Sequence, residues 1–266
     1  MTNEPICIYG RGKLGATLFE RAEEAGIRAR LLQGRGDEGE APSASLIVLA
    51  IPDGAVSERM HALDARFSAS IPFVHGAGTL PSRFELASGR PTGGMHPLIS
   101  FASRDHLPRL RGRTFTLRGD QEAIERAHAF VLALGGVPLI RELSGPAYHA
   151  AAAVLANGGV ALADLAASIL DSLGIEERER NLALAGLLES VADNLRELGP
   201  VHALTGPIAR GDAQTVEAHR RALSPEARRD YDAVARIILG TAQKAGLDEE
   251  ASAQILRAIE RSDLNR

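Results

Sequence analysis

The chain has 266 residues, a length that favours two domains or one large α/β unit with an appendage. Its 24% charged and 45% hydrophobic residues are typical of a soluble globular protein, and a net charge of -4 argues against nucleic-acid or anionic-membrane binding. The single cysteine, Cys7, cannot form an internal disulfide or a thiolate metal cage, and the N-terminus lacks a signal-peptide pattern. We therefore expect a cytoplasmic protein without a metal site.

Short apolar runs in the first half predict strands, because each is bounded by Gly, Pro, Asp or Ser. Segments with helical spacing alternate with them, which favours a parallel sheet with crossover helices. We predict an α/β fold with a doubly wound, Rossmann-type parallel sheet over residues 1–143. The expected strands are 6–9, 46–51, 71–75, 115–117 and 137–140, and the expected helices are 14–25, 55–65 and 121–134.

The second half, residues 144–266, is predicted to be all helical. Ser144-Gly145-Pro146 is typical of a helix start, and no proline follows before Gly174, so one long helix is expected. Its apolar stretch 150–163 is shorter than the about 20 residues that a bilayer requires, so we expect a buried helix and not a membrane span. Further helices are predicted at 176–198, 213–222, 225–245 and 249–262.

The first predicted strand runs directly into a glycine motif, Gly10-Arg11-Gly12-Lys13-Leu14-Gly15, and a helix begins inside that motif. In a dinucleotide site the first glycine permits the tight turn, the second leaves room for a pyrophosphate, and the third lets helix and strand pack closely. The free N–H groups of the helix N-terminus then face the anion. The order of strand, turn and helix favours this interpretation over an ordinary βα turn.

The preference between the two nicotinamide cofactors is set about 20 residues past such a motif, where a carboxylate holds the ribose of NAD. Here the chain reads Arg30-Leu31-Leu32-Gln33-Gly34-Arg35, and no acid occurs before Asp37. Arg35 or Arg11 could instead pair with a 2′-phosphate through a forked guanidinium. We predict NADP as the cofactor, with NAD possible; both arginines could also be solvated loop residues.

Two other strand ends are candidates for cofactor contacts, because ligands in open α/β sheets bind beyond the carboxyl ends of strands. Ile51-Pro52-Asp53 is expected on the ribose side, and Gly76-Ala77-Gly78 on the nicotinamide side. A plain turn is the alternative for the second segment.

Three polar side chains are candidates for contact with a substrate. His96 precedes a proline in a loop-like segment, 94–101, and either handles a proton or has a structural role. His149 and Asn157 share one face of the long helix, where His could exchange a proton with a carbonyl or imine and Asn could orient it. Hydrogen bonds to neighbouring backbone are the alternative for each of these two residues.

A polar loop between later helices contains Thr205-Gly206-Pro207 and Arg210-Gly211-Asp212. Arg210 could bind a carboxylate with two hydrogen bonds, and Thr205 could offer a hydroxyl. In the structural alternative, Asp212 caps the next helix and Arg210 pairs with it.

The whole chain resembles a family of bacterial proteins with a Rossmann-like N-terminal domain and a C-terminal DUF2520 domain. The resemblance rests on the glycine motif, His96-Pro97, Tyr148-His149 with Asn157, and the Thr205–Asp212 loop with His219 and Tyr231 beyond. Such proteins are similar in architecture to pyrroline-5-carboxylate, ketopantoate and β-hydroxyacid reductases, whose helical domain is like that of 6-phosphogluconate dehydrogenase. The resemblance implies a cofactor-dependent reductase.

Two departures from these relatives concern the proton donor. β-Hydroxyacid dehydrogenases typically present Lys-x-x-x-Asn on the long helix, whereas this helix has no lysine, and position 145, often basic in related sequences, is glycine. His149 and His96 remain as candidates.

The sequence as a whole predicts an oxidoreductase that transfers hydride from NADPH to a small, anionic carbonyl or imine, such as a 2-keto acid or a ketopantoate-like compound, in an interdomain cleft. The alternative is a non-catalytic dinucleotide-binding sensor or scaffold. Alanine is concentrated after Ser144, and because small residues let helices approach closely we also expect a homodimer.

Overall fold

The computed structural model describes residues 4–34 and 43–260. Its contacts divide the chain into two compact units, Met1–Asn157 and Gly158–Arg266. The division falls inside the long helix and not before residue 144, so the first turns of that helix, with His149, belong to the unit that contains the sheet.

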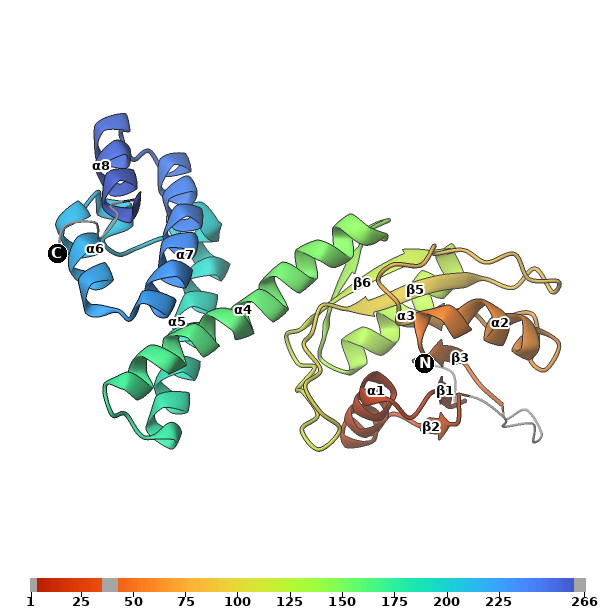
Figure 1. The fold of residues 1–266 in the computed structure, drawn as a ribbon. Helices are drawn as coiled ribbons and strands as arrows, with labels where there is room; N and C mark the ends of the chain where they lie inside the picture. The colour runs from red at the N-terminus through yellow and green to blue at the C-terminus, as the bar shows by residue number, and fades with distance from the viewer. Residues whose placement is uncertain (1–3, 35–42, 261–266) are drawn as a thin grey trace. The chain divides into compact units, whose positions relative to one another are not determined.

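The first unit is built on a seven-stranded sheet in the order β2-β1-β3-β4-β5-β6-β7 (Figure 1). All neighbouring strands are parallel except β5 and β6, which are antiparallel. The predicted α/β class is confirmed, with this single departure from a parallel sheet. The strands are β1 (Ile6–Tyr9), β2 (Ala29–Leu32), β3 (Leu46–Leu49), β4 (Phe73–His75), β5 (Thr92–Pro97), β6 (Thr114–Gly119) and β7 (Val137–Ile140).

Helices pack on both faces of this sheet. On one face, α1 (Lys13–Glu24) and α3 (Gln121–Ala133) contribute Leu18 and Phe130 to an apolar cluster with β-strand residues. On the other face, α2 (Asp53–Asp64) contributes Met60 to a second cluster that includes Phe73. The chain is therefore doubly wound, as predicted, because apolar residues alternate between the two faces along the strands.

Strand β5 corrects the expectation of a loop at residues 94–97. The sequence pattern does not indicate this strand, because it contains Gly93 and Gly94, and glycine has little intrinsic preference for extended structure. Both glycines are required by packing: a Cβ on Gly93 would lie 2.7 Å from the carbonyl oxygen of Arg118, and one on Gly94 would lie 2.6 Å from the Cζ of Arg118.

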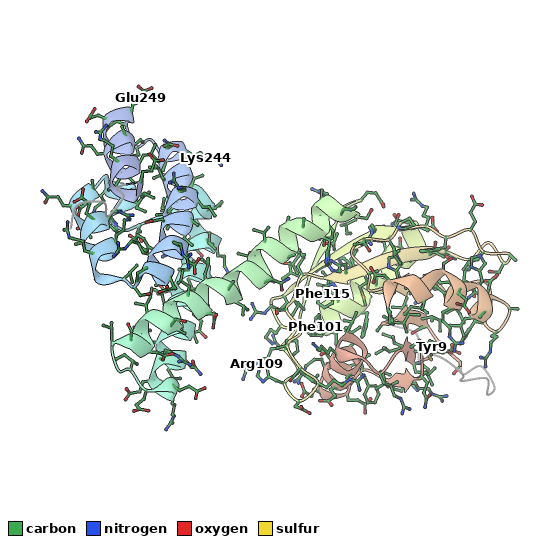
Figure 2. All side chains as sticks on the ribbon, viewed as in Figure 1. Tyr9, Phe101, Arg109, Phe115, Lys244 and Glu249 are labelled. Atoms are coloured by element: carbon green, nitrogen blue, oxygen red, sulfur yellow. The ribbon has the colours of Figure 1, made fainter. Side chains whose placement is uncertain are left out.

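The second unit draws its core from four of its elements. These are a short 3₁₀ helix, η1 (Ile208–Arg210), and the helices α6 (Ala213–Ala222), α7 (Pro225–Lys244) and α8 (Glu249–Glu260). Lys244 and Glu249, labelled in Figure 2, flank the turn between the last two helices. The core residues are Ile208, Val216, Ala235, Leu239, Ala242, Ile255, Ala258 and Ile259. Alanines on facing helices let these elements pack closely.

The helix α4 (Pro146–Ser172) has none of its residues buried, so the expectation of a buried helix is wrong. Val154, Leu155 and Val160 are 75%, 72% and 66% exposed. By length and composition alone α4 could cross a membrane, since an 18-residue window has a mean hydropathy of 1.7. The sequence shows that a helix is apolar but not what covers it. Helix α5 (Glu177–His202), interrupted at Gly199, is likewise without buried residues.

Candidate functional site

The glycine motif after β1 has the geometry that a dinucleotide requires. Gly10 has φ +114°, a conformation that L side chains rarely adopt, and a Cβ there would collide with the carbonyl oxygen of Ala50. A Cβ on Gly15 would collide with the carbonyl oxygen of Gly10. These two glycines therefore allow the close packing of strand, turn and helix.

Gly12 differs from these two glycines, because a Cβ there would meet nothing within 4 Å. It is the N-cap residue of α1, where no side chain caps the helix, and the first turn contains no acidic residue. The N–H groups of the first turn therefore have no side-chain cap, and the exposed Lys13 and Arg11 lie beside them. This arrangement fits a pyrophosphate.

The end of β2 lies against the glycine motif, since the Gly10 N–H donates to the Leu32 carbonyl over 3.0 Å. Gln33 and Gly34 follow β2, so no carboxylate stands at the end of this strand in the described chain. Arg35, one of the two predicted partners of a 2′-phosphate, lies outside the described residues, as does Asp37. Arg11 is the predicted partner that the structure places at the motif.

The turn after β4 packs between the glycine motif and His96. A Cβ on Gly76 would collide with the Cδ2 of Leu14, and one on Gly78 would lie 2.9 Å from the Nε2 of His96. The turn is joined to the start of α2 as well, because Thr79 donates to the Asp53 carboxylate over 2.6 Å. The predicted segments Ile51-Pro52-Asp53 and Gly76-Ala77-Gly78 therefore lie together at the carboxyl edge of the sheet.

His96 is the centre of a hydrogen-bonded cluster. Its Nδ1 lies 2.9 Å from the Tyr148 hydroxyl, which lies 2.7 Å from the Thr116 hydroxyl. His96 and Thr116 are directly opposite in the antiparallel pair β5–β6, so their side chains share one face of the sheet. The ring of His149 is 6.5 Å from the ring of His96 between centroids. The structure thus brings two predicted residues together and adds two new ones.

The electrostatic environment keeps the His96 imidazole neutral. Burial, followed by the nearby Arg118 and His149, lowers the pKa of His96 to about 4, while Asp53 acts in the opposite direction. A neutral ring has one N–H donor and one acceptor nitrogen, so Nδ1 either accepts the Tyr148 proton or donates to the hydroxyl oxygen. In both forms the imidazole and the phenol share a hydrogen bond along which a proton can move.

A second histidine at this edge, His75, is structural. It is fully buried; its Nδ1 accepts from the Ala77 N–H over 3.2 Å, and its Nε2 lies 2.9 Å from the Pro81 carbonyl. Because Nδ1 is an acceptor, Nε2 carries the proton and donates to the carbonyl. Burial lowers the pKa of His75 to about 4. His75 therefore fixes both ends of the turn after β4.

Other predicted site residues lie elsewhere. Asn157 is exposed on α4 as the last residue of the first unit. Thr205 and Arg210 lie in the second unit, where both are exposed. Asp212 caps α6 as the structural alternative states, since it accepts from the backbone N–H of Thr215 over 3.0 Å.

Sequence reasoning did not assign site roles to Tyr148, Thr116 or Arg118. One signal was present in β6, where Thr114, Thr116 and Arg118 alternate with apolar residues and must therefore share a face. Only the pairing with β5 shows that this face carries His96. Among the described residues, no group of three or more His, Cys, Asp and Glu side chains could hold a metal ion.

A cavity of about 890 Å³ lies at the opposite edge of the sheet. It is lined by Ile6 and Leu46, the first residues of β1 and β3, together with residues of α3 and of the turn after α1. Ligands in open α/β sheets bind at the carboxyl ends of strands. We therefore place the candidate site at the glycine motif and His96, and not in this cavity.

The sheet, the glycine motif and the helical second unit define a class of α/β protein with a Rossmann-like fold followed by a helical region. Within this class, residues 113–238 match the family model described as "Domain of unknown function (DUF2520)". The expected similarity to the DUF2520 family is thus confirmed over residues 113–238. No match was found among curated proteins.

Solved structures resemble the chain over nearly its whole length. A Thermotoga maritima protein is 25% identical, with a TM-score of 0.65 over 90% of this chain and 99% of that one. 1-Pyrroline-5-carboxylate reductase from Streptococcus pyogenes is 17% identical, with a TM-score of 0.58 over 97% of each chain. Reductive aminase from Aspergillus terreus in complex with NADPH is 15% identical, with a TM-score of 0.52 over 97% and 93%. The chain thus shares its fold with NAD(P)-dependent reductases.

Proposed function

We propose that the protein is an NAD(P)-dependent reductase that prefers NADP(H) and reduces a small carbonyl or imine at the carboxyl edge of its sheet. The observation that carries this proposal is the position of the His96–Tyr148 pair. The His96 ring of this pair packs against Gly78 in the turn after β4. The same turn also packs against Leu14 of the glycine motif. The glycine motif and the His96–Tyr148 pair therefore lie at one edge of the sheet, which supports the proposal.

The residues of the glycine motif fit the cofactor. Backbone N–H groups at the start of α1 would hold the pyrophosphate, with Gly12 leaving the space for it. Arg11 would pair with the 2′-phosphate, and Gly76 and Gly78 would line the nicotinamide side. NADP(H) bound there supplies the hydride.

The polar cluster would supply the proton. The Tyr148 hydroxyl, bonded to both His96 and Thr116, would give its proton to a carbonyl oxygen or imine nitrogen. The neutral imidazole would then relay a replacement proton that comes from water, since it can accept a proton at Nε2 as it gives one to the Tyr148 oxygen from Nδ1. His149, beside His96, would contact the substrate, and we assign Asn157 to its orientation. We keep Thr205 and Arg210 as contributors to binding of an anionic substrate, a 2-keto acid or ketopantoate-like compound.

The direct test is NADPH oxidation against a panel of 2-keto acids and cyclic imines, with calorimetric titration of NADPH and NADH alongside. We expect turnover of at least one compound and tighter binding of NADPH. Tight NADPH binding without turnover would favour the alternative, a non-catalytic sensor or scaffold, which the absence of a lysine from α4 also permits. Tighter binding of NADH would contradict the assignment of Arg11.

We also propose that the protein is a cytoplasmic homodimer that pairs through α4 and α5. Both helices lack buried residues yet carry exposed apolar side chains such as Leu155 and Leu187, at 72% and 64%. A second copy fits better than a bilayer, since Tyr148 in the first turn of α4 is bonded to the sheet and Asp164 lies further along. Light scattering that shows a monomer at micromolar concentration would exclude the dimer.

A further inference from the structure

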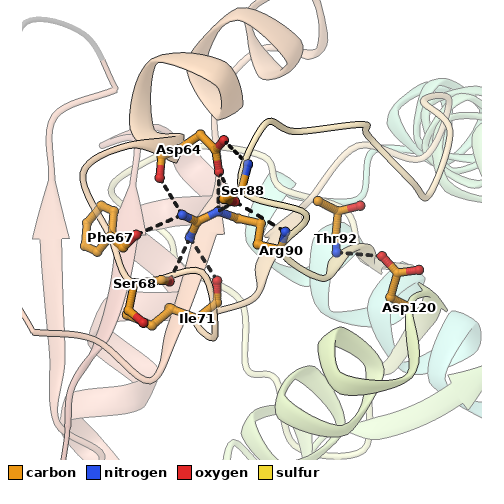
Figure 3. A network of polar contacts seen from close by, with 8 residues as sticks. All are labelled: Asp64, Phe67, Ser68, Ile71, Ser88, Arg90, Thr92 and Asp120. Atoms are coloured by element: carbon orange, nitrogen blue, oxygen red, sulfur yellow. Dashed lines mark hydrogen bonds and ion pairs between the residues drawn. The ribbon is translucent and has the colours of Figure 1, made fainter.

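Two arginines of the first unit are almost completely buried, and their surroundings differ. Arg90, 3% exposed, pairs with the Asp64 carboxylate over 2.6 Å and donates to the backbone carbonyls of Ser68, Ile71 and Phe67 (Figure 3). All three of its guanidinium nitrogens have partners, and its charge is compensated. Arg90 therefore joins the end of α2 to the chain before β5, which is a structural role.

Arg118, 1% exposed, has no such compensation. Its Nη2 donates to the carbonyls of Ala77 and Leu80 over 2.7 and 3.3 Å, whereas Nε and Nη1 have no hydrogen-bond partner and no ion pair to Arg118 occurs in the described chain. A buried ion without a counter-ion costs several kcal/mol of stability. Fold stability alone therefore does not explain an arginine at this position.

The path of the side chain shows what Arg118 contacts. It crosses β5 over Gly94, where a Cβ would lie 2.6 Å from its Cζ, and reaches the turn after β4. The same turn carries Gly78, against which the His96 ring packs. His96 and Arg118 also share one face of the β5–β6 pair, because Thr116 opposite His96 is two residues from Arg118.

We propose that Arg118 is a positioning residue for His96: its guanidinium holds the turn on which the imidazole packs, and its charge, which forms no ion pair in the described chain, acts on that imidazole. The other titratable groups that face His96 are Tyr148 and His149 on α4, Asp53 at the start of α2 and His75 on β4. Among these groups only Arg118 is a permanent cation. The role in catalysis rests on the proposed function of His96, but the effect on the imidazole does not.

The experiment measures the titration of His96 in the cofactor-free full chain by proton–carbon NMR of labelled histidine, with the signal assigned through His96→Gln. In Arg118→Met we expect the His96 midpoint to rise by about one pH unit, because a nearby cation is removed. Arg118→Lys keeps the charge and is expected to restore most of the low midpoint. Arg83→Met, which removes an exposed cation paired with Asp120, is the matched control and should leave His96 unchanged.

Three results would overturn the proposal. One is a His96 midpoint in Arg118→Met that equals that of Arg83→Met. Another is an equal rise in Arg118→Met and Arg118→Lys, since the charge would then have no effect. The third is failure of both Arg118 variants to fold, which would make Arg118 structural like Arg90. Because the titration needs no turnover, it can succeed even if no reductase activity is found, and the two proposals fail separately.

Discussion

Alanine substitutions at Gly12 and Gly15 distinguish two roles of the glycine motif. One role is to leave space for a cofactor, and the other is to allow close packing of the fold. Gly12 has φ -74° and ψ -175°, which alanine adopts without strain, and its Cβ would meet no protein atom within 4 Å. We expect Gly12→Ala to change the free energy of unfolding by less than about 1 kcal/mol. If the pyrophosphate occupies that space, NADPH affinity should fall at least tenfold, or about 1.4 kcal/mol.

Gly15→Ala should behave differently, because its Cβ would collide with the carbonyl oxygen of Gly10. Overpacking of this kind costs about 1–3 kcal/mol, so the Tm should fall by roughly 2–10 °C and NADPH binding should be lost as well. The control is Gly240→Ala inside α7, where a Cβ also meets nothing. It should stabilise the helix by about 0.5–1 kcal/mol and leave NADPH affinity unchanged.

The assays are thermal unfolding followed by circular dichroism and calorimetric titration with NADPH. The reasoning predicts an unchanged Tm with weak binding for Gly12→Ala, and a lower Tm with weak binding for Gly15→Ala. Wild-type NADPH affinity in Gly12→Ala would refute the assignment of that space to the pyrophosphate.

Four further predictions concern other parts of the molecule. Tyr148→Phe removes the hydroxyl between His96 and Thr116, so kcat should fall about 10²-fold with a stability loss of about 1 kcal/mol, measured by steady-state kinetics and Tm. Arg90→Met leaves Asp64 buried without its partner and should cost about 3–5 kcal/mol in urea unfolding; a loss under 1 kcal/mol would contradict that. The pKa of His75 is about 4 when folded, below its unfolded value of 6.5, so the unfolded state binds more protons between these values. The contribution of His75 to stability should fall by about 3 kcal/mol at most as pH drops from 6.5 to 4, and His75→Gln should remove this part of the pH dependence of urea unfolding, whereas the part due to His96 should remain. Leu155→Asp should shift the proposed dimer toward monomer in light scattering.

Much of the fold was predictable because apolar periodicity and helix punctuation are local signals. The strand 6–9, the helix 213–222 and the start of the long helix at Pro146 are found in the structure at the predicted positions. The strand β5 was not predictable, because its glycines Gly93 and Gly94 are required by contacts with β6, which lies more than 20 residues away in the chain. The exposure of α4 was not predicted either, because the apolar composition of a helix does not show which surface, if any, covers it.

The candidate site was predictable only in part. The glycine motif and His96 follow from local order, but Tyr148, Thr116 and Arg118 reach His96 only through the pairing of β5 with β6 and the start of α4. His96 and Tyr148 are 52 residues apart in the chain, so no local sequence pattern indicates that they contact each other.

The three glycines Gly76, Gly78 and Gly94 each leave space that another residue's side chain fills, namely Leu14, His96 and Arg118. A larger residue at any of these glycines would displace the side chain that fills its space. A change of cofactor or substrate specificity therefore cannot be obtained by adding a side chain at these positions. Positions with open surroundings, such as Arg11 and Gln33, tolerate a wider choice of residues. A library that aims to alter cofactor preference should therefore keep the glycines constant and vary the exposed residues.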